Sequence, residues 1–278
     1  MSEALRALAL GLGDDELVLG HRHSEWTGYA PHIEEDVAFS SIAQDEIGHA
    51  AAFYSIAAKV DGASPDELAF GREPSAYTHA RMCERPNKEW AYTLARHWLY
   101  DTADDVRLEA LEASSNSELA QLAVKMRREE RYHLLHADMW LRRLAEGPVE
   151  GRTKLAHALS EAFTDVAGLF EPFPKEEDAL SEGLLPVASE ELQERFVRRA
   201  EETLERYRLS RVINSFQGET AEFVASSSGD LLAAEGDGQT VTETREALGG
   251  RRGEHTDDFA SLWDVMTITY RDHPGATW

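Results

Sequence analysis

The pattern Glu-x-x-His occurs twice in this chain, each time within a stripe of apolar residues that has the period of an α-helix. The two stripes share the same spacing along the helix: Ile42, Glu46, His49, Phe53 and Ile56 in the first, and Met126, Glu130, His133, Ala137 and Trp140 in the second. An acid and an imidazole on the apolar face of a helix cost several kcal/mol unless a partner compensates them. Because residues three apart lie on the same side of a helix, a metal ion between the two helices can be bound by both pairs.

Helical periodicity extends over most of the chain, and strand signals are scarce. Glycine and proline breaks divide the first half of the chain into four long helices, which we expect at about 14–27, 34–60, 87–113 and 118–145. The first helix is predicted to begin at the acidic residues Asp14, Asp15 and Glu16, and a shorter helix is predicted at 76–84. Four long helices in this order favour an all-α fold built on an antiparallel four-helix bundle.

The rest of the chain is predicted to extend the same domain. Amphipathic patterns indicate three further helices, at about 152–170, 188–209 and 257–271. Residues 217–241 are rich in glycine, serine and acidic residues, which is typical of a surface loop. We therefore predict a single domain over residues 1–278, with the bundle core at 14–145 and accessory helices and a long loop at 146–278.

Composition excludes several classes of function. The chain has 278 residues and a formal net charge of −24, from 52 acidic and 28 basic residues, so nucleic acid is not expected as a partner. An apolar run long enough to span a membrane is missing from the sequence, and the first residues are acidic where a signal peptide would be basic. Cys83 is the single cysteine, which excludes a disulfide framework and a thiolate zinc site. We expect a cytoplasmic protein, and the acid-rich, lysine-poor composition leaves open a halophilic source or an ordinary acidic cytosolic enzyme.

The other two bundle helices are each expected to supply one inward carboxylate. Glu25 shares a face with Leu17 and His21, and Asp101 lies between Trp98 and Leu108 on an apolar face. Together with the two Glu-x-x-His pairs they make six candidate ligands, namely Glu25, Glu46, His49, Asp101, Glu130 and His133. Four carboxylates largely balance the charge of two divalent cations, which offsets the cost of burying them. The pattern therefore predicts a di-iron or di-manganese site in the bundle interior.

Alternatives to this site remain open from the residues alone. Glu46 and Glu130 would form buried ion pairs with arginine, or their helix faces would be turned to solvent. Neighbouring acids are expected to be solvated or to support the ligands: Glu16, Asp45, Asp104, Asp105 and Glu129. His97 and His136 are expected at the surface or an interface, with an outer role around the ligands as the alternative. Core packing is expected for Tyr54 and Tyr132, with a radical role as the alternative.

The motifs that carry these residues resemble the phenylacetic acid catabolic protein family, the ferritin-like subunits of the multicomponent phenylacetyl-CoA 1,2-epoxidase. Over its full length the chain is similar to the C subunit, usually described as structural, through segments such as "RPNKEWAYTLARHWLYDTADDV" and "GRRGEHTDDF". At the ligand positions it resembles the catalytic A subunit, through "SEW", "QDEIGH", "WLYD" and "REERYH". The first Glu-x-x-His pair is typically degraded in C subunits and is intact here, so the resemblance leaves both roles open.

The resemblance implies a ferritin-like bundle that binds two iron ions, or manganese, and uses O2 to epoxidise the ring of an aryl-acyl-CoA. It implies two partners, a separate reductase and a homologous ferritin-like subunit, in a homo- or hetero-oligomer. The single cysteine agrees with an external electron source, because it cannot hold an iron–sulfur cluster. A non-catalytic structural subunit that scaffolds a catalytic homologue is the alternative, and iron storage is a third interpretation. "GGRRGEHT", with Arg251 and Arg252, is expected to be a plain loop, with binding of CoA phosphates or of an acidic partner face as the alternative.

Overall fold

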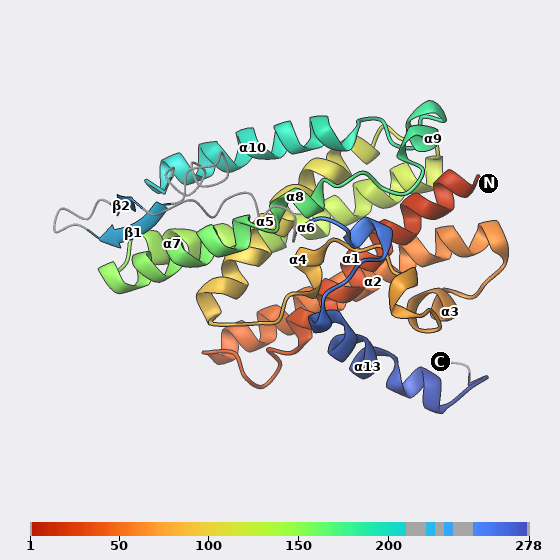
Figure 1. Ribbon diagram of the computed structural model, residues 1–278, viewed down its shortest axis with the longest axis horizontal. Coiled ribbons are helices and arrows are strands. Elements are labelled where there is room, and N and C mark those ends of the chain that lie inside the picture. Colours follow the sequence, from red (N-terminus) through yellow and green to blue (C-terminus); the bar gives the residue numbers. More distant parts are fainter. Residues whose placement is uncertain (1, 210–220, 226–230, 236–246, 277–278) are drawn as a thin grey trace.

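Four long helices form the centre of the molecule, which is known from a computed structural model that describes residues 2–209, 221–225, 231–235 and 247–276 (Figure 1). These helices are α1 (Glu3–Ser24), α2 (Ile33–Asp61), α5 (Trp90–Leu111) and α6 (Ser117–Ala145). Helix α1 packs along α2, and α5 packs along α6. The predicted all-α, ferritin-like antiparallel four-helix bundle with additional C-terminal helices is therefore confirmed.

Helix α1 begins eleven residues before the predicted start at Asp14. Ser2 caps it, with its side-chain oxygen accepting a hydrogen bond from the Leu5 N–H at 3.2 Å. The acidic run that suggested a helix start is instead fully interior, since Asp14, Asp15 and Glu16 expose 1% or less of their surface. These three acids have partners inside the protein, so the prediction of a cap at Asp14 was wrong.

Close contact between α1 and α2 depends on a glycine. A Cβ atom at Gly20 would lie 2.9 Å from Ile47 Cγ1 and 3.2 Å from Glu46 Cβ. Only a residue without a side chain allows the two helices to approach this closely. The approach brings α1 against the part of α2 that carries the first Glu-x-x-His pair.

Short elements connect the two halves of the bundle. Gly62, with φ of 81°, ends α2 in a left-handed conformation. It is followed by α3 (Pro65–Phe70), the 3₁₀ turn η1 (Pro74–Ala76) and α4 (Arg81–Glu84). The helix predicted at 76–84 is thus reduced to the single turn of α4, because residues 77–80 are irregular. Within the described ranges, every helix is too short or too polar to cross a membrane.

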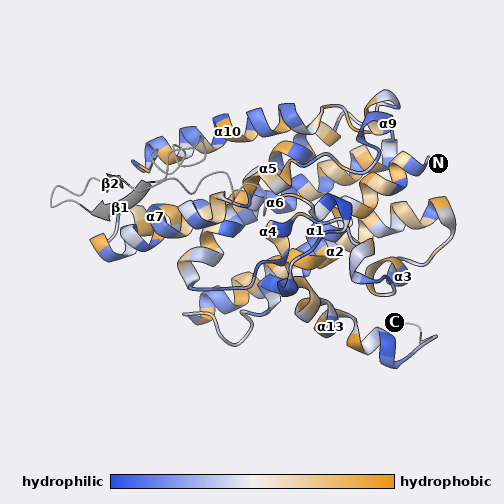
Figure 2. Ribbon diagram, viewed as in Figure 1, coloured by the Kyte–Doolittle hydropathy of each residue, from blue (hydrophilic) through white to orange (hydrophobic). Residues whose placement is uncertain are grey.

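Accessory helices cover the bundle on opposite sides (Figure 1). The predicted helix at 152–170 is divided into α7 (Val149–Phe163) and α8 (Val166–Leu169), and it is followed by α9 (Glu176–Ser181) and α10 (Ser189–Arg206). Helix α10 is largely hydrophilic in Figure 2 and buries Leu192, Phe196, Ala200 and Leu204. On the opposite side, α13 (Asp257–Asp272) packs near α3 and α4.

A small antiparallel pair of strands stands where a loop was predicted. Strand β1 (Ala221–Ala225) pairs with β2 (Leu231–Glu235), with Phe223 opposite Ala233. The prediction of a continuous loop at 217–241 was therefore wrong at these ten residues, and the rest of that stretch lies outside the described residues.

The segment "GGRRGEHT" ties the end of the chain to the bundle. Arg251, in the 3₁₀ turn η2 (Gly250–Arg252), exposes 1% of its surface and donates hydrogen bonds to Asp15 of α1 at 2.7 and 2.9 Å. Its guanidinium carbon also lies 4.2 Å from the ring centre of Phe173. The segment is a loop with one 3₁₀ turn, as predicted, but Arg251 is a buried partner of Asp15 and not an exposed basic residue that could reach a CoA phosphate.

A second buried ion pair joins α1 to the connecting segment. Asp14 is fully buried and accepts hydrogen bonds from Tyr54 Oη and the Thr78 N–H, both at 2.7 Å, and from Arg72. Burial alone would raise the pKa of Asp14, but Arg72 and these hydrogen bonds outweigh it and hold the pKa below its usual value. The predicted core position of Tyr54 is confirmed.

Asp14→Asn is expected to reduce the free energy of unfolding at pH 7 by about 3 kcal/mol, because it leaves the largely buried Arg72 without its counter-charge. The pKa of Asp14 is lowered in the folded state, so its contribution is present above its unfolded pKa of about 3.9 and is lost as the pH falls. Urea unfolding of both proteins should therefore show a difference that shrinks from about pH 5 to pH 3. Asp264→Asn, which alters an exposed pair with Arg271, is the control and should have little effect. A pH-independent difference between the wild type and Asp14→Asn would contradict the ionic role of Asp14.

Candidate metal centre

Six donor side chains from the four bundle helices lie in the interior. Each exposes 3% or less of its surface, and they are Glu16 of α1, Glu46 and His49 of α2, Asp101 of α5, and Glu130 and His133 of α6. Five of these six are the residues predicted from the sequence. The helices place them there because each occupies an apolar face that packs toward the bundle axis.

The donors form two groups that share one carboxylate. Glu16, His49 and Glu130 make the first group, and Asp101, Glu130 and His133 make the second, with the ligating atoms of each group within 4.8 Å of one another. His49 Nδ1 lies 3.2 Å from Glu16 Oε2 and 3.4 Å from Glu130 Oε1. His133 Nδ1 lies 3.2 Å from the same Glu130 oxygen. Two adjacent cation positions bridged by Glu130 fit this arrangement.

Glu46 of α2 is the sixth donor, and it faces His23 of α1. Both of its carboxylate oxygens lie 2.9 Å from His23 Nδ1. Burial, followed by the negative charges of Glu16, Asp101 and Glu130, raises the pKa of Glu46 well above its usual value. His23 thus positions this carboxylate, which lies close to the negative charges of the other three carboxylates.

Asp101 has the clearest need for a further partner. It is fully buried, and neither carboxylate oxygen accepts a hydrogen bond from the described residues, although His97 Nδ1 lies 3.0 Å from Oδ2. Burial raises the pKa of Asp101 to about 8. A buried carboxylate without hydrogen bonds is costly, and a cation at this position would compensate it.

The two histidines are oriented as metal ligands commonly are. Burial alone would lower the pKa of His49, but Glu16, Glu130 and Glu129 outweigh it and raise the pKa to about 9. The Nδ1 atoms of both histidines point inward, while His49 Nε2 lies 3.0 Å from Glu129 and His133 Nε2 lies 3.3 Å from Asp45. Metal-bound imidazoles typically donate their second N–H to a carboxylate in this way. Asp45 and Glu129 are 45% and 37% exposed, as expected for solvated acids that support the ligands.

The predicted ligand Glu25 does not reach this cluster. It caps the C-terminal end of α1, its side chain is 40% exposed, and it accepts hydrogen bonds from Arg22 at 2.7 Å and Asn87 at 3.0 Å. Glu16 is the carboxylate of α1 that lies in the cluster, so the predicted position of Glu25 among the buried donors was wrong. A signal was present in the sequence, because Leu12, Glu16, Leu19 and His23 repeat the offsets of the two Glu-x-x-His stripes and all four are buried.

His97 was expected at the surface or an interface and lies in the interior instead, beside His23. His23 and His97 are fully buried, with ring centres 5.4 Å apart and both next to Phe39. Burial and the nearby His133 lower the pKa of His97 to about 3, so this ring is neutral. His136 Nε2 on α6 lies 2.7 Å from Glu35 Oε2 on α2. The expected surface position of His97 was therefore wrong, and these rings fill the space beside Glu46 and Asp101.

Comparison with known proteins identifies the family. A family-wide sequence model described as phenylacetic acid catabolic protein matches residues 1–216. The chain belongs to this family. The C subunit of 1,2-phenylacetyl-CoA epoxidase from Escherichia coli is 36% identical over 168 residues, which cover 60% of this chain and 68% of that relative. The A subunit of the same enzyme, from the same organism, is 25% identical over 190 residues, which cover 64% of this chain and 61% of that relative.

The resemblance inferred from the sequence motifs is thus confirmed at the level of the family. Similarity to two different subunits of one enzyme agrees with the mixed character of the motifs. The identity to the C subunit is the higher of the two. Four carboxylates and two imidazoles form a donor set that suits iron or manganese.

Glu16→Gln is expected to lose at least half of the iron bound by the wild-type chain, because it removes a buried carboxylate ligand. Glu25→Gln is the matched control on the same helix and should keep its full iron content. Iron per chain is measured by elemental analysis after anaerobic loading with ferrous iron and gel filtration. Loss of iron in Glu25→Gln with full retention in Glu16→Gln would reverse our correction.

Proposed function

We propose that this chain is the di-iron carboxylate subunit of a multicomponent phenylacetyl-CoA 1,2-epoxidase, an oxygen-dependent monooxygenase of phenylacetate catabolism. The observation that carries the proposal is the two groups of buried donors that share Glu130, five residues in all, with the buried carboxylate of Glu46 beside them. Membership of the family and similarity to the C and A subunits of that enzyme supply the substrate class, an aryl-acyl-CoA.

The residues of the chain have separable roles in this proposal. Glu16 and His49 would hold one cation, Asp101 and His133 would hold the other, Glu130 belongs to both groups, and Glu46 would add a further carboxylate beside them. When bound, a pair of iron ions supplies the reductive activation of O2. Burial of the ligands excludes bulk water, which strengthens the electrostatic interactions inside the site.

Electrons come from a separate reductase in this proposal. Cys83 is the single cysteine of the sequence and is fully buried, so it cannot ligate an iron–sulfur cluster alone. Burial and the nearby Asp15 also raise the pKa of its thiol well above the usual value, which argues against a redox role for this residue.

A non-catalytic structural subunit is the second candidate function. The observation that favours it is the higher identity to the C subunit than to the A subunit, 36% against 25%. In that role the chain would scaffold a catalytic homologue, and its own donors would bind metal without turnover. The two candidates differ in whether the activity of the complex depends on the donors of this chain.

His49→Gln combined with His133→Gln is expected to lower phenylacetyl-CoA-dependent O2 consumption by at least about 100-fold, because both cation positions lose their imidazole. The assay uses the complex assembled with the reductase and the homologous subunit, and Glu25→Gln serves as the control. Circular dichroism and gel filtration establish that the variant is folded and assembled. Full activity of the assembled double variant would refute a catalytic role and support the scaffold.

We also propose that the homologous subunit docks on an apolar surface over α2 and α6. This docking surface comprises Ile33, Val37, Tyr132, Leu135 and Met139, each at least half exposed. A hydrogen bond of 2.7 Å between Glu35 and His136 joins α2 to α6. Exposed apolar groups of this extent are typical of interaction sites. Tyr132 is 73% exposed, so its predicted place in the core was wrong.

Leu135→Asp is expected to weaken binding of the homologous subunit by at least tenfold, because a charge would be buried in the interface. Val265→Asp is the control, since Val265 is similarly exposed on α13. The dissociation constants are measured by isothermal titration calorimetry with the purified subunits. Equal affinities for the wild type and Leu135→Asp would place the interface elsewhere.

A further inference from the structure

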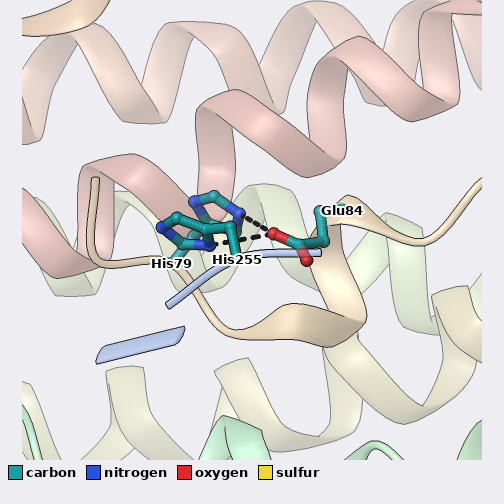
Figure 3. Close-up of side chains that lie close together, drawn as sticks. All are labelled: His79, Glu84 and His255. Carbon is teal, nitrogen blue, oxygen red and sulfur yellow. Dashed lines mark hydrogen bonds and ion pairs between the residues drawn. The ribbon is translucent and has the colours of Figure 1, made fainter. Parts of the chain in front are cut away.

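Buried carboxylates of this protein differ in how their two oxygens are used, and Glu84 shows the complete case. Its Oε1 atom accepts a hydrogen bond from the Thr256 N–H at 2.7 Å. Its Oε2 atom lies 2.7 Å from His79 Nε2 and 2.9 Å from His255 Nδ1 (Figure 3). The two imidazole rings are stacked, with their centres 4.0 Å apart. Both oxygens of Glu84 are therefore satisfied by the chain itself.

Glu16, the donor that α1 contributes to the metal centre, divides its oxygens between two tasks. The hydroxyl of Tyr100 donates a hydrogen bond to Glu16 Oε1 at 2.8 Å. The other oxygen, Oε2, lies 3.2 Å from His49 Nδ1, within the first donor group of Glu16, His49 and Glu130. Tyr100 thus takes up one oxygen of this ligand, and the second oxygen lies beside the other donors.

The surroundings of Tyr100 keep its hydroxyl a donor. The side chain is in the interior, with 2% of the residue exposed. Burial, followed by the negative charges of Glu16 and Asp104, raises the pKa of Tyr100 well above its usual value. The phenol therefore stays protonated. Tyr100 also directly precedes Asp101 on α5, so this helix contacts the first donor group through Tyr100 and supplies Asp101 to the second.

We infer that Tyr100 is a positioning residue of the first donor group, which holds Glu16 Oε1 by a hydrogen bond and leaves Oε2 to bind the cation. This role rests on the proposed function, because it requires that the first group binds iron. Without the hydroxyl, Oε1 would be left in the interior without its donor, and the carboxylate could turn away from His49. Hydrogen-bond partners of metal ligands contribute about 10- to 100-fold to metal affinity.

Tyr100→Phe is expected to weaken iron binding at the first donor group by about tenfold and to leave the second group nearly unchanged. Crystals of each protein are equilibrated under exclusion of air with ferrous iron, at a free concentration that half-fills the wild-type sites. Anomalous diffraction at the iron edge then gives the occupancy at each group, and the first-to-second ratio should fall about tenfold in the variant.

Tyr92→Phe is the matched control, because Tyr92 is a buried tyrosine of the same helix. It lies eight residues before Tyr100, about 12 Å along the helix axis, and its ring centre is 4.9 Å from Lys88 Nζ. Removal of its hydroxyl should leave the occupancy ratio at the wild-type value.

Two results would overturn the role of Tyr100. A wild-type occupancy ratio in Tyr100→Phe would show that the hydroxyl does not position Glu16, and an equal loss at both groups would indicate a general structural role. Wild-type crystals that bind no iron at either group would instead refute the proposed function, and this role with it. Should Tyr100→Phe fail to fold, as judged by circular dichroism, Tyr100→Met serves in its place with the same expected ratio.

Discussion

Negative charge buried in the middle of the bundle is the constraint on which the rest of this structure depends. Glu16, Glu46, Asp101 and Glu130 face a common interior with two imidazoles as their main positive partners. Ionised carboxylates in such surroundings cost several kcal/mol each unless cations or protons compensate them. The raised pKa values of Glu46 and Asp101 show that burial favours protons at these oxygens when no metal is bound. A pair of divalent cations would balance the same negative charge. The Nδ1 atoms of His49 and His133 point toward these carboxylates and are placed to bind such cations.

The surrounding structure holds these groups in place from several directions. Gly20 lets α1 lie against α2, and His23 fixes both oxygens of Glu46. Farther along α1, Asp14 and Asp15 bind Arg72 and Arg251, which come from the connecting segment and the end of the chain. The C-terminal segment thus contributes to the placement of α1, the helix that supplies Glu16. This arrangement gives the residues beyond the four bundle helices a part in building the site.

Local patterns were sufficient to predict much of this architecture. The two Glu-x-x-His pairs could be recognised because both members lie three residues apart on one helix face, so the signal is contained in a short segment. A helix that contributes one carboxylate offers no such local pair, and for that reason the sequence pointed to Glu25 although Glu16 is the one that lies beside His49. Asp14, Asp15 and Glu16 also look like a helix start, and only their distant partners Arg72, Arg251 and His49 show that they are interior.

The most direct test of two adjacent, bridged cation positions is anomalous diffraction at the iron absorption edge from crystals of the iron-loaded chain. The account predicts two peaks about 3.5–4 Å apart, one beside Glu16 and His49 and the other beside Asp101 and His133, with Glu130 next to both. A single peak, or iron density confined to other parts of the molecule, would contradict it.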